Sequence, residues 1–485
     1  MAVLDRTVAA LVAMDRQSFE RCLAIATGIA TYYFYFRRGE KHAFPWRFVL
    51  FYLVSAVALV FLKSLQPQHL SAYRAAVEVI TLGCLHIVAL YAGLIIWRVL
   101  LNPLNKFPGP PLARVTKLYM VYRNYQSNLH SHHELLALHK KYGPYVRIGP
   151  NDLSVADPLA MPIVLGPNSK CRKSAWYGQD APAISINTTR DRAAHDRRRR
   201  ILAPAFNDKS LRGYAGRIQK YHDLLIRRIE EHVSRGEAMN VTKWFGLHGF
   251  DMMGDLVFSR SFRLLETGEA SDAIKLLPEG LYPQGFAFPP WLYRVYANMP
   301  GVGAGYHRFV ALAEEHLQSR LRDQGKTEQP DMLQPLLKHH QQLAPGQQQQ
   351  EHMSLLQGDS RMLIVAGSDT TSTTLIHIFY RFCTETGLLN RLREEIEPLV
   401  AGNIHAIAYQ DIHSAELLHG CINETLRLHY PGPSGFFRKT PPGGIHIGDV
   451  YVPADTIIQI PPYVMAYSKY PMKRMFTCLT IGYVI

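Results

Sequence analysis

The chain has 485 residues, of which 47% are hydrophobic and 19% charged; this length can bury a large core, as several domains or as one large enzyme domain. Its formal net charge of +14 favours an anionic partner surface, which could be nucleic acid, acidic lipid or an acidic protein. The six cysteines are scattered without a C-x-x-C pair, which argues against a zinc module or a disulfide framework and indicates a reducing compartment.

The amino-terminal part contains three apolar runs, at residues 22–36, 48–62 and 75–97. Only the third clearly exceeds the roughly 20 residues that a bilayer requires. The first two reach spanning length if flanking residues snorkel or the bilayer thins. We therefore predict a membrane anchor over residues 1–105 with two to three transmembrane helices; the alternative is buried helices of a soluble protein.

Basic residues flank the same side of these runs: Arg37, Arg38, Lys41 and Arg47 between the first two, and Arg98, Lys106, Arg114 and Lys117 after the third. The positive-inside rule places both groups on the cytosolic side. Three spans with a lumenal amino terminus satisfy this arrangement. The chain after residue 100 would then be cytosolic, and no signal-peptide cleavage site is evident.

After the anchor, "NKFPGPPLARV" carries prolines that prevent a helix and predicts a stiff extended linker. Alternating apolar residues in "YGPYVRIGPNDLSVAD" (142–157) predict a β-hairpin, and helical periodicity dominates much of the rest. The glutamine-rich stretch 338–352 predicts an exposed loop. Its His339 and His340 could bind a metal, but solvated loop residues are the favoured interpretation.

The stretch "AGSDTTSTT" lies between apolar segments that predict a buried helix. Glycine, serine, threonine and aspartate are poor choices for plain helix packing. Gly367 would let another group approach the backbone, and a threonine hydroxyl that bonds backward could open the helix locally. Asp369 and Thr370 would then supply a proton path; the alternative is a purely structural kink.

Three further segments carry candidate site residues. Glu424 and Arg427 in "CINETLRLHYP" lie three positions apart on one helix face, as a structural clamp or as a chance surface pair. His195 and Arg199 in "RAAHDRRRRILAPAF" lie four apart on a helix that continues into apolar residues. The four consecutive arginines could signal nucleic-acid binding, but an apolar helix in a membrane-anchored chain disfavours that. Arg438 begins a Gly- and Pro-punctuated stretch that predicts a small β region.

These segments together resemble microsomal cytochromes P450. The anchor, "FPGPP", "YGPYVRIGPNDLSV", "HDRRRRILAPAF", "AGSDTT", "ETLR" and "RKTPPGG" follow the order of that family over about residues 106–470, and the several-span anchor resembles a fungal subgroup. The resemblance implies a mainly α fold with a small β region, a helical prism that encloses haem and oxidises an apolar small molecule. It implies NADPH-cytochrome P450 reductase as redox partner, with no role for nucleic acid.

The resemblance also assigns roles. Asp369 and Thr370 match the acid and alcohol pair that delivers protons, and Ala366 and Gly367 match the oxygen-groove positions of the helix that crosses the haem. A second group matches residues that hold the fold or the haem: the Glu424 and Arg427 structural pair, Arg199 and Arg438 as propionate partners, and His195 in place of a frequent tryptophan.

The family's axial ligand is a cysteine thiolate within F-x-x-G-x-R-x-C-x-G. Cys478, in "FTCLTIGYVI", lacks that spacing and positive surroundings, so we do not expect it to be the ligand. We assign no metal ligand and interpret residues 471–485 as an aberrant tail after an incomplete catalytic domain.

The favoured hypothesis is a haem-dependent monooxygenase of fungal secondary metabolism in the endoplasmic reticulum membrane, with its body on the cytosolic side. The alternative is an inactive truncated remnant without haem-thiolate ligation.

Overall fold

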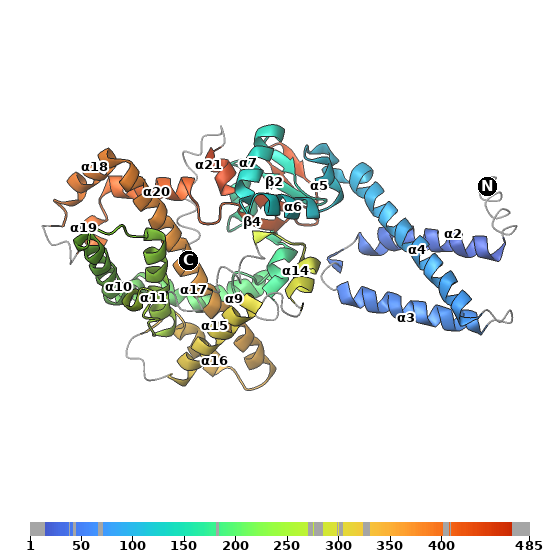
Figure 1. Cartoon of the computed structure of the whole chain (residues 1–485), viewed down its shortest axis with the longest axis horizontal. Helices are drawn as coiled ribbons and strands as arrows, with labels where there is room; N and C mark the ends of the chain where they lie inside the picture. The colour runs from blue at the N-terminus through green and yellow to red at the C-terminus, as the bar shows by residue number, and fades with distance from the viewer. Residues whose placement is uncertain are drawn as a thin grey trace.

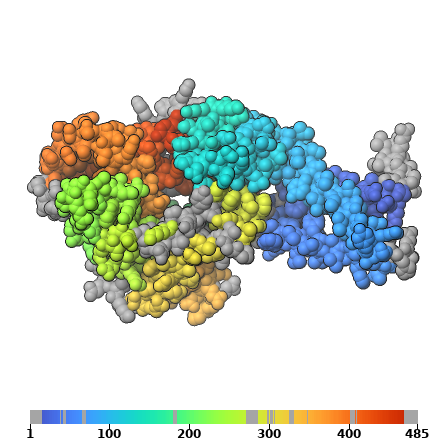
Figure 2. All heavy atoms as spheres, in the orientation of Figure 1, coloured from blue at the N-terminus to red at the C-terminus, as the bar shows by residue number. Residues whose placement is uncertain are grey.

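The structure is a computed structural model that describes residues 15–37, 39–41, 45–65, 71–180, 184–269, 275, 285–297, 299, 304–323, 330–400, 407 and 409–467. An anchor of amino-terminal helices projects from one side of a larger body (Figures 1 and 2). In the body the β-sheet lies next to the anchor and the helices α18 to α20 lie at the far end.

The anchor consists of α2 (Arg16–Ala30), α3 (Pro45–Ser64) and α4 (Ala72–Ile96). Short π-helical segments extend α2 over Thr31–Phe36 (η1) and α4 over Trp97–Leu101 (η3). Among the described residues, two helical stretches are long and apolar enough to cross a membrane: Pro45–Ser64, with mean hydropathy 1.9, and Ala72–Lys106, with mean hydropathy 2.3. The first predicted run forms a helix, but α2 does not meet this criterion.

Polar contacts join the three anchor helices. Lys63 of α3 donates to Glu20 of α2 at 2.6 Å and to Glu78 of α4 at 2.9 Å. His86 of α4 lies between Thr27 of α2 and Tyr52 of α3, at 3.1 and 3.2 Å. Each helix thus contributes to both contacts, and the anchor is one bundle.

The body contains two sheets. The larger has the order β1-β2-β7-β4-β3, and its strands are Tyr145–Arg147, Asp152–Val155, Ile457–Ile460, Phe436–Lys439 and Arg172–Lys173. The smaller pairs β5 (Ile445–Ile447) with β6 (Val450–Val452). The antiparallel β1–β2 pair, with Tyr145 opposite Val155, confirms the predicted hairpin. The β region predicted after Arg438 is confirmed as well.

Helices make up most of the body: α5 (Pro111–Val115), α6 (Leu118–Gln126), α7 (Ser131–Tyr142), α8 (Ala160–Leu165), α9 (Arg192–Leu202), α10 (Asp208–Ser234), α11 (Val241–Phe258), α12 (Leu264–Thr267), α14 (Pro290–Ala297), α15 (Ala304–Arg322), α16 (Gln334–Gln342), α17 (Gln347–Thr384), α18 (Thr386–Ile396), α19 (Tyr409–Ile412), α20 (Glu416–Leu428) and α21 (Pro462–Tyr467). Single 3₁₀ turns are η4 (Pro103–Lys106), η5 (Ala175–Asp180) and η6 (Ala203–Phe206). The predicted mainly α fold with a small β region is confirmed.

Two hydrophobic cores organise the body. The larger surrounds α11 and α17, because α11 is apolar on nearly all sides and is almost wholly buried. The second lies under the larger sheet and includes Leu104 and Phe107. Phe107 belongs to the stretch predicted to be a stiff extended linker, and Leu104 lies just before it. The predicted absence of helix in this stretch is wrong for Pro111–Val115, which form α5. The Pro108 carbonyl accepts a hydrogen bond from the Arg147 amide of β1 at 2.8 Å. The linker is therefore packed into the sheet core.

The glutamine-rich stretch 338–352 is largely helical, so the predicted loop is wrong, although most of its described residues from 341 to 351 are exposed as predicted. Helix α16 runs to Gln342 and α17 begins at Gln347, which leaves a connection of only four residues. His340 and His352 are buried. Composition suggested a solvated segment because glutamine is polar, but His352 is hydrogen-bonded to Arg198 of α9 and His340 is hydrogen-bonded to His352.

Candidate functional site

The middle of α17 is an unbroken helix although its residues favour other conformations. Four of its hydroxyls donate back to a carbonyl four positions earlier; for example, Ser368 donates to Ile364 at 2.6 Å and Thr370 to Ala366 at 2.6 Å. These bonds satisfy the hydroxyls within the helix, so the hydroxyls no longer draw the backbone into other conformations. The predicted local opening of the helix does not occur in the described structure.

Ala366, Asp369 and Thr370 share an exposed face of α17, whereas Gly367 is half-buried. A Cβ on Gly367 would lie 2.6 Å from the Met253 sulfur of α11. The close approach that the sequence predicted at this glycine is therefore made by a side chain of the core. Asp369 has no hydrogen-bond partner among the described residues, and desolvation by the surrounding protein raises the pKa of its carboxyl.

Helix α9 presents its arginines in two directions. It begins where Asp191 accepts a hydrogen bond from the Ala194 amide at 2.6 Å. Arg199 is exposed, and its guanidinium has no partner within the described part of the chain. His195 is half-buried and lies 3.0 Å from the Asp196 carboxylate. The neighbouring Arg198 points inward and is 3% exposed.

Arg198 belongs to a buried polar network that the sequence did not reveal. Its Nε donates to Asp359 of α17 and its Nη1 donates to His352 Nε2. Because a guanidinium only donates, His352 Nε2 accepts and His352 is neutral, with its proton on Nδ1. That proton is donated to His340 Nδ1 at 3.1 Å. Burial and the charge of Arg198 lower the pKa of His352 to about 3.

Arg438 lies on β4 beside the short strand β3. Its Nη1 donates to the Tyr177 hydroxyl at 3.1 Å, and its guanidinium lies 5.5 Å from the centre of that ring. Lys173 is its register partner on β3 and donates to the Ile186 carbonyl at 2.8 Å. Burial and the nearby Arg438 lower the pKa of Lys173 to about 7. Two basic side chains in register on neighbouring strands favour an anionic ligand, which would hold Lys173 in its charged form.

Two buried donors beside this cation pair lack partners among the described residues. They are the Ser174 hydroxyl and the Trp176 indole nitrogen. Trp176 packs on Phe437 with ring centres 5.4 Å apart, and the Ser174 amide is hydrogen-bonded to the Phe437 carbonyl. Buried donors are rarely left unpaired in folded proteins, so they indicate a missing acceptor. We call Lys173, Ser174, Trp176, Tyr177 and Arg438 the cation edge.

Glu424 and Arg427 form the predicted pair on α20. Two bonds of 2.7 and 2.6 Å join the guanidinium to the carboxylate, and Arg427 also donates to the Ala466 carbonyl of α21 at 3.0 Å. The Glu395 carboxylate of α18 caps the helix by accepting from the Leu417 amide at 2.8 Å. The Glu424 side chain is 57% exposed, so the pair is not buried in the described structure.

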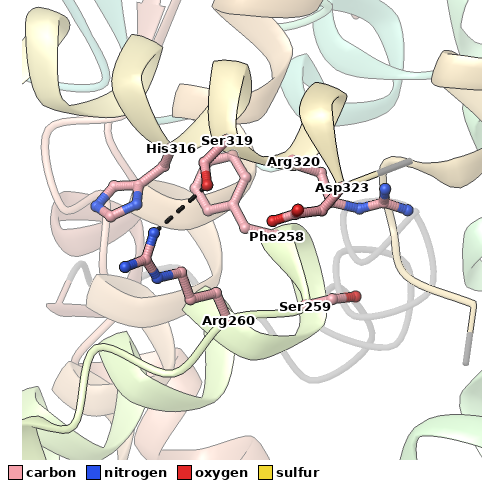
Figure 3. A pocket seen from close by; sticks show the side chains of 7 residues that line it. All are labelled: Phe258, Ser259, Arg260, His316, Ser319, Arg320 and Asp323. Atoms are coloured by element: carbon pink, nitrogen blue, oxygen red, sulfur yellow. Dashed lines mark hydrogen bonds between the residues drawn. The ribbon is translucent and has the colours of Figure 1, made fainter. Parts of the chain in front are cut away.

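A polar cavity of about 260 Å³ lies elsewhere, between the end of α11 and α15 (Figure 3). Its lining contains Phe258, Ser259, Arg260, His316, Ser319, Arg320 and Asp323, with Arg260 donating to Ser319 at 3.4 Å. None of the predicted site residues lines it. Sequence reasoning did not find this cavity, because its residues come from separate helices and form no local motif.

Comparison with known proteins decides the family. A family profile described as Cytochrome P450 matches residues 108–470. The chain belongs to the cytochrome P450 family. It is 56% identical over 458 residues to cytochrome P450 monooxygenase lcsK of Purpureocillium lilacinum, covering 94% of this chain and 82% of that protein.

More distant relatives are also fungal cytochromes P450. Tryprostatin B 6-hydroxylase of Aspergillus fumigatus is 35% identical over 459 residues, covering 93% of this chain and 81% of the relative. Cytochrome P450 monooxygenase notG' of Aspergillus versicolor is 35% identical over 441 residues, covering 91% and 79%. The identified family confirms the resemblance seen in the sequence.

The cytochrome P450 family implies haem, and the cation edge of this chain fits its carboxylates. The unpaired donors of Ser174 and Trp176, together with Arg438, supply the hydrogen-bond donors and charge that propionates require. Arg199 adds an exposed cation without a described partner. Among the described residues no group of three or more His, Cys, Asp or Glu side chains is arranged to hold a metal ion. Cys478 and the predicted tail 471–485 lie outside the described residues.

The structure brings the predicted residues to several elements that meet around α17. Lys173 and Asp359 meet at Ile186, where Asp359 accepts from the amide at 2.6 Å and Lys173 donates to the carbonyl. This links the cation edge to α17 and, through Arg198, to α9. Among the described residues, the hydrogen bond from Thr370 to the Ala366 carbonyl joins two predicted site residues of α17, whereas none joins Asp369 or Thr370 to a predicted site residue of another element. Their assignments stay predictions.

Proposed function

We propose that the chain is the membrane-bound catalytic part of a haem-dependent monooxygenase that oxidises an apolar small molecule in fungal secondary metabolism. The observation that carries the proposal is the cation edge, whose unpaired buried donors and depressed lysine pKa suit a dicarboxylate cofactor beside α17. The relatives support the reaction class, because their names describe monooxygenases and a hydroxylase. They lend no support to the alternative of an inactive product.

Under this proposal, haem held at the cation edge supplies the iron at which dioxygen is activated. Arg438, Trp176 and Arg199 would bind the carboxylates of the cofactor. The exposed face of α17 then provides proton transfer. Asp369 holds a proton on its carboxyl more readily than an ordinary aspartate because desolvation raises its pKa. Thr370 Oγ1 can pass on its proton after it releases the Ala366 carbonyl, and the Asp369 carboxyl then supplies the replacement proton.

The remaining assignments complete the proposal. Glu424 and Arg427 hold α20 against α21. The apolar helices α3 and α4 anchor the chain in the endoplasmic reticulum membrane, and the flanking basic residues place the body on the cytosolic side. The body would there receive electrons from NADPH-cytochrome P450 reductase. Residues 1–105 serve as anchor and 106–470 as catalytic domain.

The test compares two membrane-expressed forms beside a reductase. One is the chain as given; in the other, residues after 470 are replaced by the corresponding segment of the 56% identical relative. We expect the second form to give a thiolate-type carbon monoxide difference spectrum and reductant-dependent oxidation of apolar substrates. From the spacing around Cys478 we expect the first to lack that band. A second form that binds no haem would contradict the proposal.

A further inference from the structure

The connection between α2 and α3 touches the catalytic body. Its described part is residues 39–41, and Glu40 Oε1 accepts a hydrogen bond from Arg190 Nη2 at 2.7 Å. Lys439 Nζ lies 3.7 Å from the same oxygen. The side chains of Glu40, Arg190 and Lys439 are 26%, 35% and 25% exposed, so this contact is shielded from solvent more than an ordinary surface pair.

Contacts within the anchor fix the position of this connection. The Arg37 guanidinium lies 3.7 Å from the centre of the Trp97 ring at the end of α4 and 4.8 Å from that of Tyr33. Gly39 follows with φ of +74°, a backbone conformation that side-chain-bearing residues rarely adopt. The turn directs Glu40 toward the body. Residues 37–47 contain several basic residues but no other acid, so Glu40 is the group in this stretch that can pair with cations.

The body side of the contact is continuous with the cation edge. Arg190 also donates to the Lys173 carbonyl at 3.3 Å, and Lys439 follows Arg438 directly on β4. In the β3–β4 register, Arg172 is opposite Lys439 and Lys173 is opposite Arg438. Glu40 therefore connects Arg190, in the segment just before α9, to Lys439 on β4, the strand that also carries Arg438. On the outer side of that edge Glu40 pairs with Arg190 and shares Lys439 with Asp455, which lies 2.8 Å from Lys439 Nζ, while the inner side keeps its unpaired donors.

We propose that Glu40 is a positioning residue: it docks the cytosolic connection of the anchor onto the β3–β4 edge and holds that edge in the geometry that presents Lys173 and Arg438. The docking itself stands on the contacts of Glu40 with Arg190 and Lys439. Its consequence for cofactor binding rests on the proposed function. The two parts need separate measurements.

The native thiol of Cys171 reports on the docking. It immediately precedes β3, is 7% exposed and is free. The full-length chain in lipid nanodiscs is labelled with a maleimide, and modification of the Cys171 peptide is followed by mass spectrometry. Glu40→Ala should raise its labelling rate roughly fivefold, because a lost ion pair of this kind makes local opening easier by about that factor. Glu40→Asp should raise the rate less.

Charge reversal separates the contact from a general loss of structure. Glu40→Arg alone should expose Cys171, and adding Arg190→Glu should restore most of its protection. Glu237→Ala removes a carboxylate remote from this edge and should leave the rate unchanged. Cys171 labelling that is insensitive to Glu40→Ala, or a reversal that Arg190→Glu fails to rescue, would overturn the docking.

The second measurement is the affinity for haem, titrated by absorbance. Glu40→Ala should weaken binding by a similar factor, and the double reversal should restore it. If labelling responds while haem affinity is unchanged, the contact exists but has no positioning role, which overturns that half of the inference. If no variant binds haem while Cys171 labelling still follows the expected order, the proposed function fails and the docking survives.

Discussion

Thr370 commits its hydroxyl proton to the Ala366 carbonyl at 2.6 Å. This proton can be transferred elsewhere only when the Thr370 side chain exchanges its bond to the Ala366 carbonyl for a bond to another acceptor. Its location on the exposed face of α17, next to Asp369, permits that exchange. The same hydroxyl thus stabilises the helix at rest and is available for proton transfer.

Replacing this hydroxyl tests its role. In the form whose residues after 470 are replaced by the segment of the 56% identical relative, Thr370→Ala should consume reductant but release more peroxide and less product. A positioned proton donor contributes roughly 100-fold or more to the step it serves. The product formed per reductant consumed is the measurement, and Thr370→Ser, which keeps the hydroxyl, is the matched control. An Ala variant with the parent's ratio would remove Thr370 from the mechanism.

Among the helices, α9, α16 and α17 are joined by the network of Arg198, Asp359, His352 and His340. Burial raises the pKa of Asp359 while Arg198 opposes that shift, and the pair stays buried at the α9–α17 contact. His352 must stay neutral to accept from Arg198. The network therefore makes the packing of three helices sensitive to acid.

His352 should destabilise the fold as pH falls. Its pKa is about 3 in the folded chain and 6.5 as an ordinary value, so the unfolded chain binds the extra proton between these limits. Above about pH 6.5 the titration of His352 does not change the free energy of unfolding. Below that pH it lowers the free energy of unfolding by about 1.4 kcal/mol per pH unit. His352→Gln keeps one acceptor and one donor without titrating. Thermal unfolding in detergent at pH 7.5 and 5.0 should show about 2 kcal/mol less acid destabilisation in the variant.

His139 and His248, whose pKa values burial lowers to about 4, titrate in both proteins and cancel in the comparison. If the parent and His352→Gln lose the same stability between pH 7.5 and 5.0, the prediction is wrong. The network would then open before His352 is protonated.

The anchor helix α2 is short and polar compared with α3 and α4, yet its Glu20 reaches Lys63 at 2.6 Å. Close packing of α2 on α4 reinforces this contact, because a Cβ on Gly28 would lie 2.3 Å from the His86 carbonyl. A charged residue in an anchor is tolerated where it pairs inside a bundle. The pairing explains how a helix that fails the span criterion can belong to the anchor.

Removing Lys63 should therefore release α2. Lys63→Ala leaves Glu20 and Glu78 without their cation, and loss of one partner of a buried ion pair costs roughly 3–5 kcal/mol. Labelling of the exposed Cys22 with a membrane-impermeant maleimide should increase, whereas Lys63→Arg should behave like the parent. Equal Cys22 labelling in all three proteins would show that α2 is held by other contacts.

For the whole molecule, the anchor and the body form a continuous structure. Arg147 of β1 is fully buried and donates to the Arg98 carbonyl at 3.2 Å and the Pro150 carbonyl at 2.7 Å. The Pro108 carbonyl of the connecting stretch accepts a hydrogen bond from the Arg147 amide of β1 at 2.8 Å. A rigid junction of this kind transmits the orientation of α4 to the sheet.

We expect the full-length chain to stay with membranes after alkaline carbonate extraction, because α3 and α4 expose apolar side chains over spanning length. If the body is on the cytosolic side, as we propose from the basic flanks, protease added to sealed microsomes should digest it. Release into the soluble fraction would contradict the anchor, and protection of the body would contradict its orientation.

Sequence reasoning was most successful where chemistry is written locally. The β1–β2 hairpin, the apolar helices and the Glu424–Arg427 pair follow from period, spacing and residue type, which is why the structure confirms them. It was wrong for His340, because glutamine-rich composition does not show which helix face meets α9. It also missed Lys173, Trp176 and Arg198, whose partners lie far away in the chain.

The sequence by itself determined the family, through motifs whose order and spacing survive without coordinates, and it singled out Asp369, Thr370, Arg199 and Arg438 by residue type. The tertiary structure alone decided that the Met253 side chain of α11 occupies the space beside Gly367 of α17. It alone placed unpaired donors beside Arg438 and brought Glu40 onto Arg190, 150 residues away. Hydrogen-bond satisfaction and burial depend on which segments pack together, and no local pattern of residues contains that information.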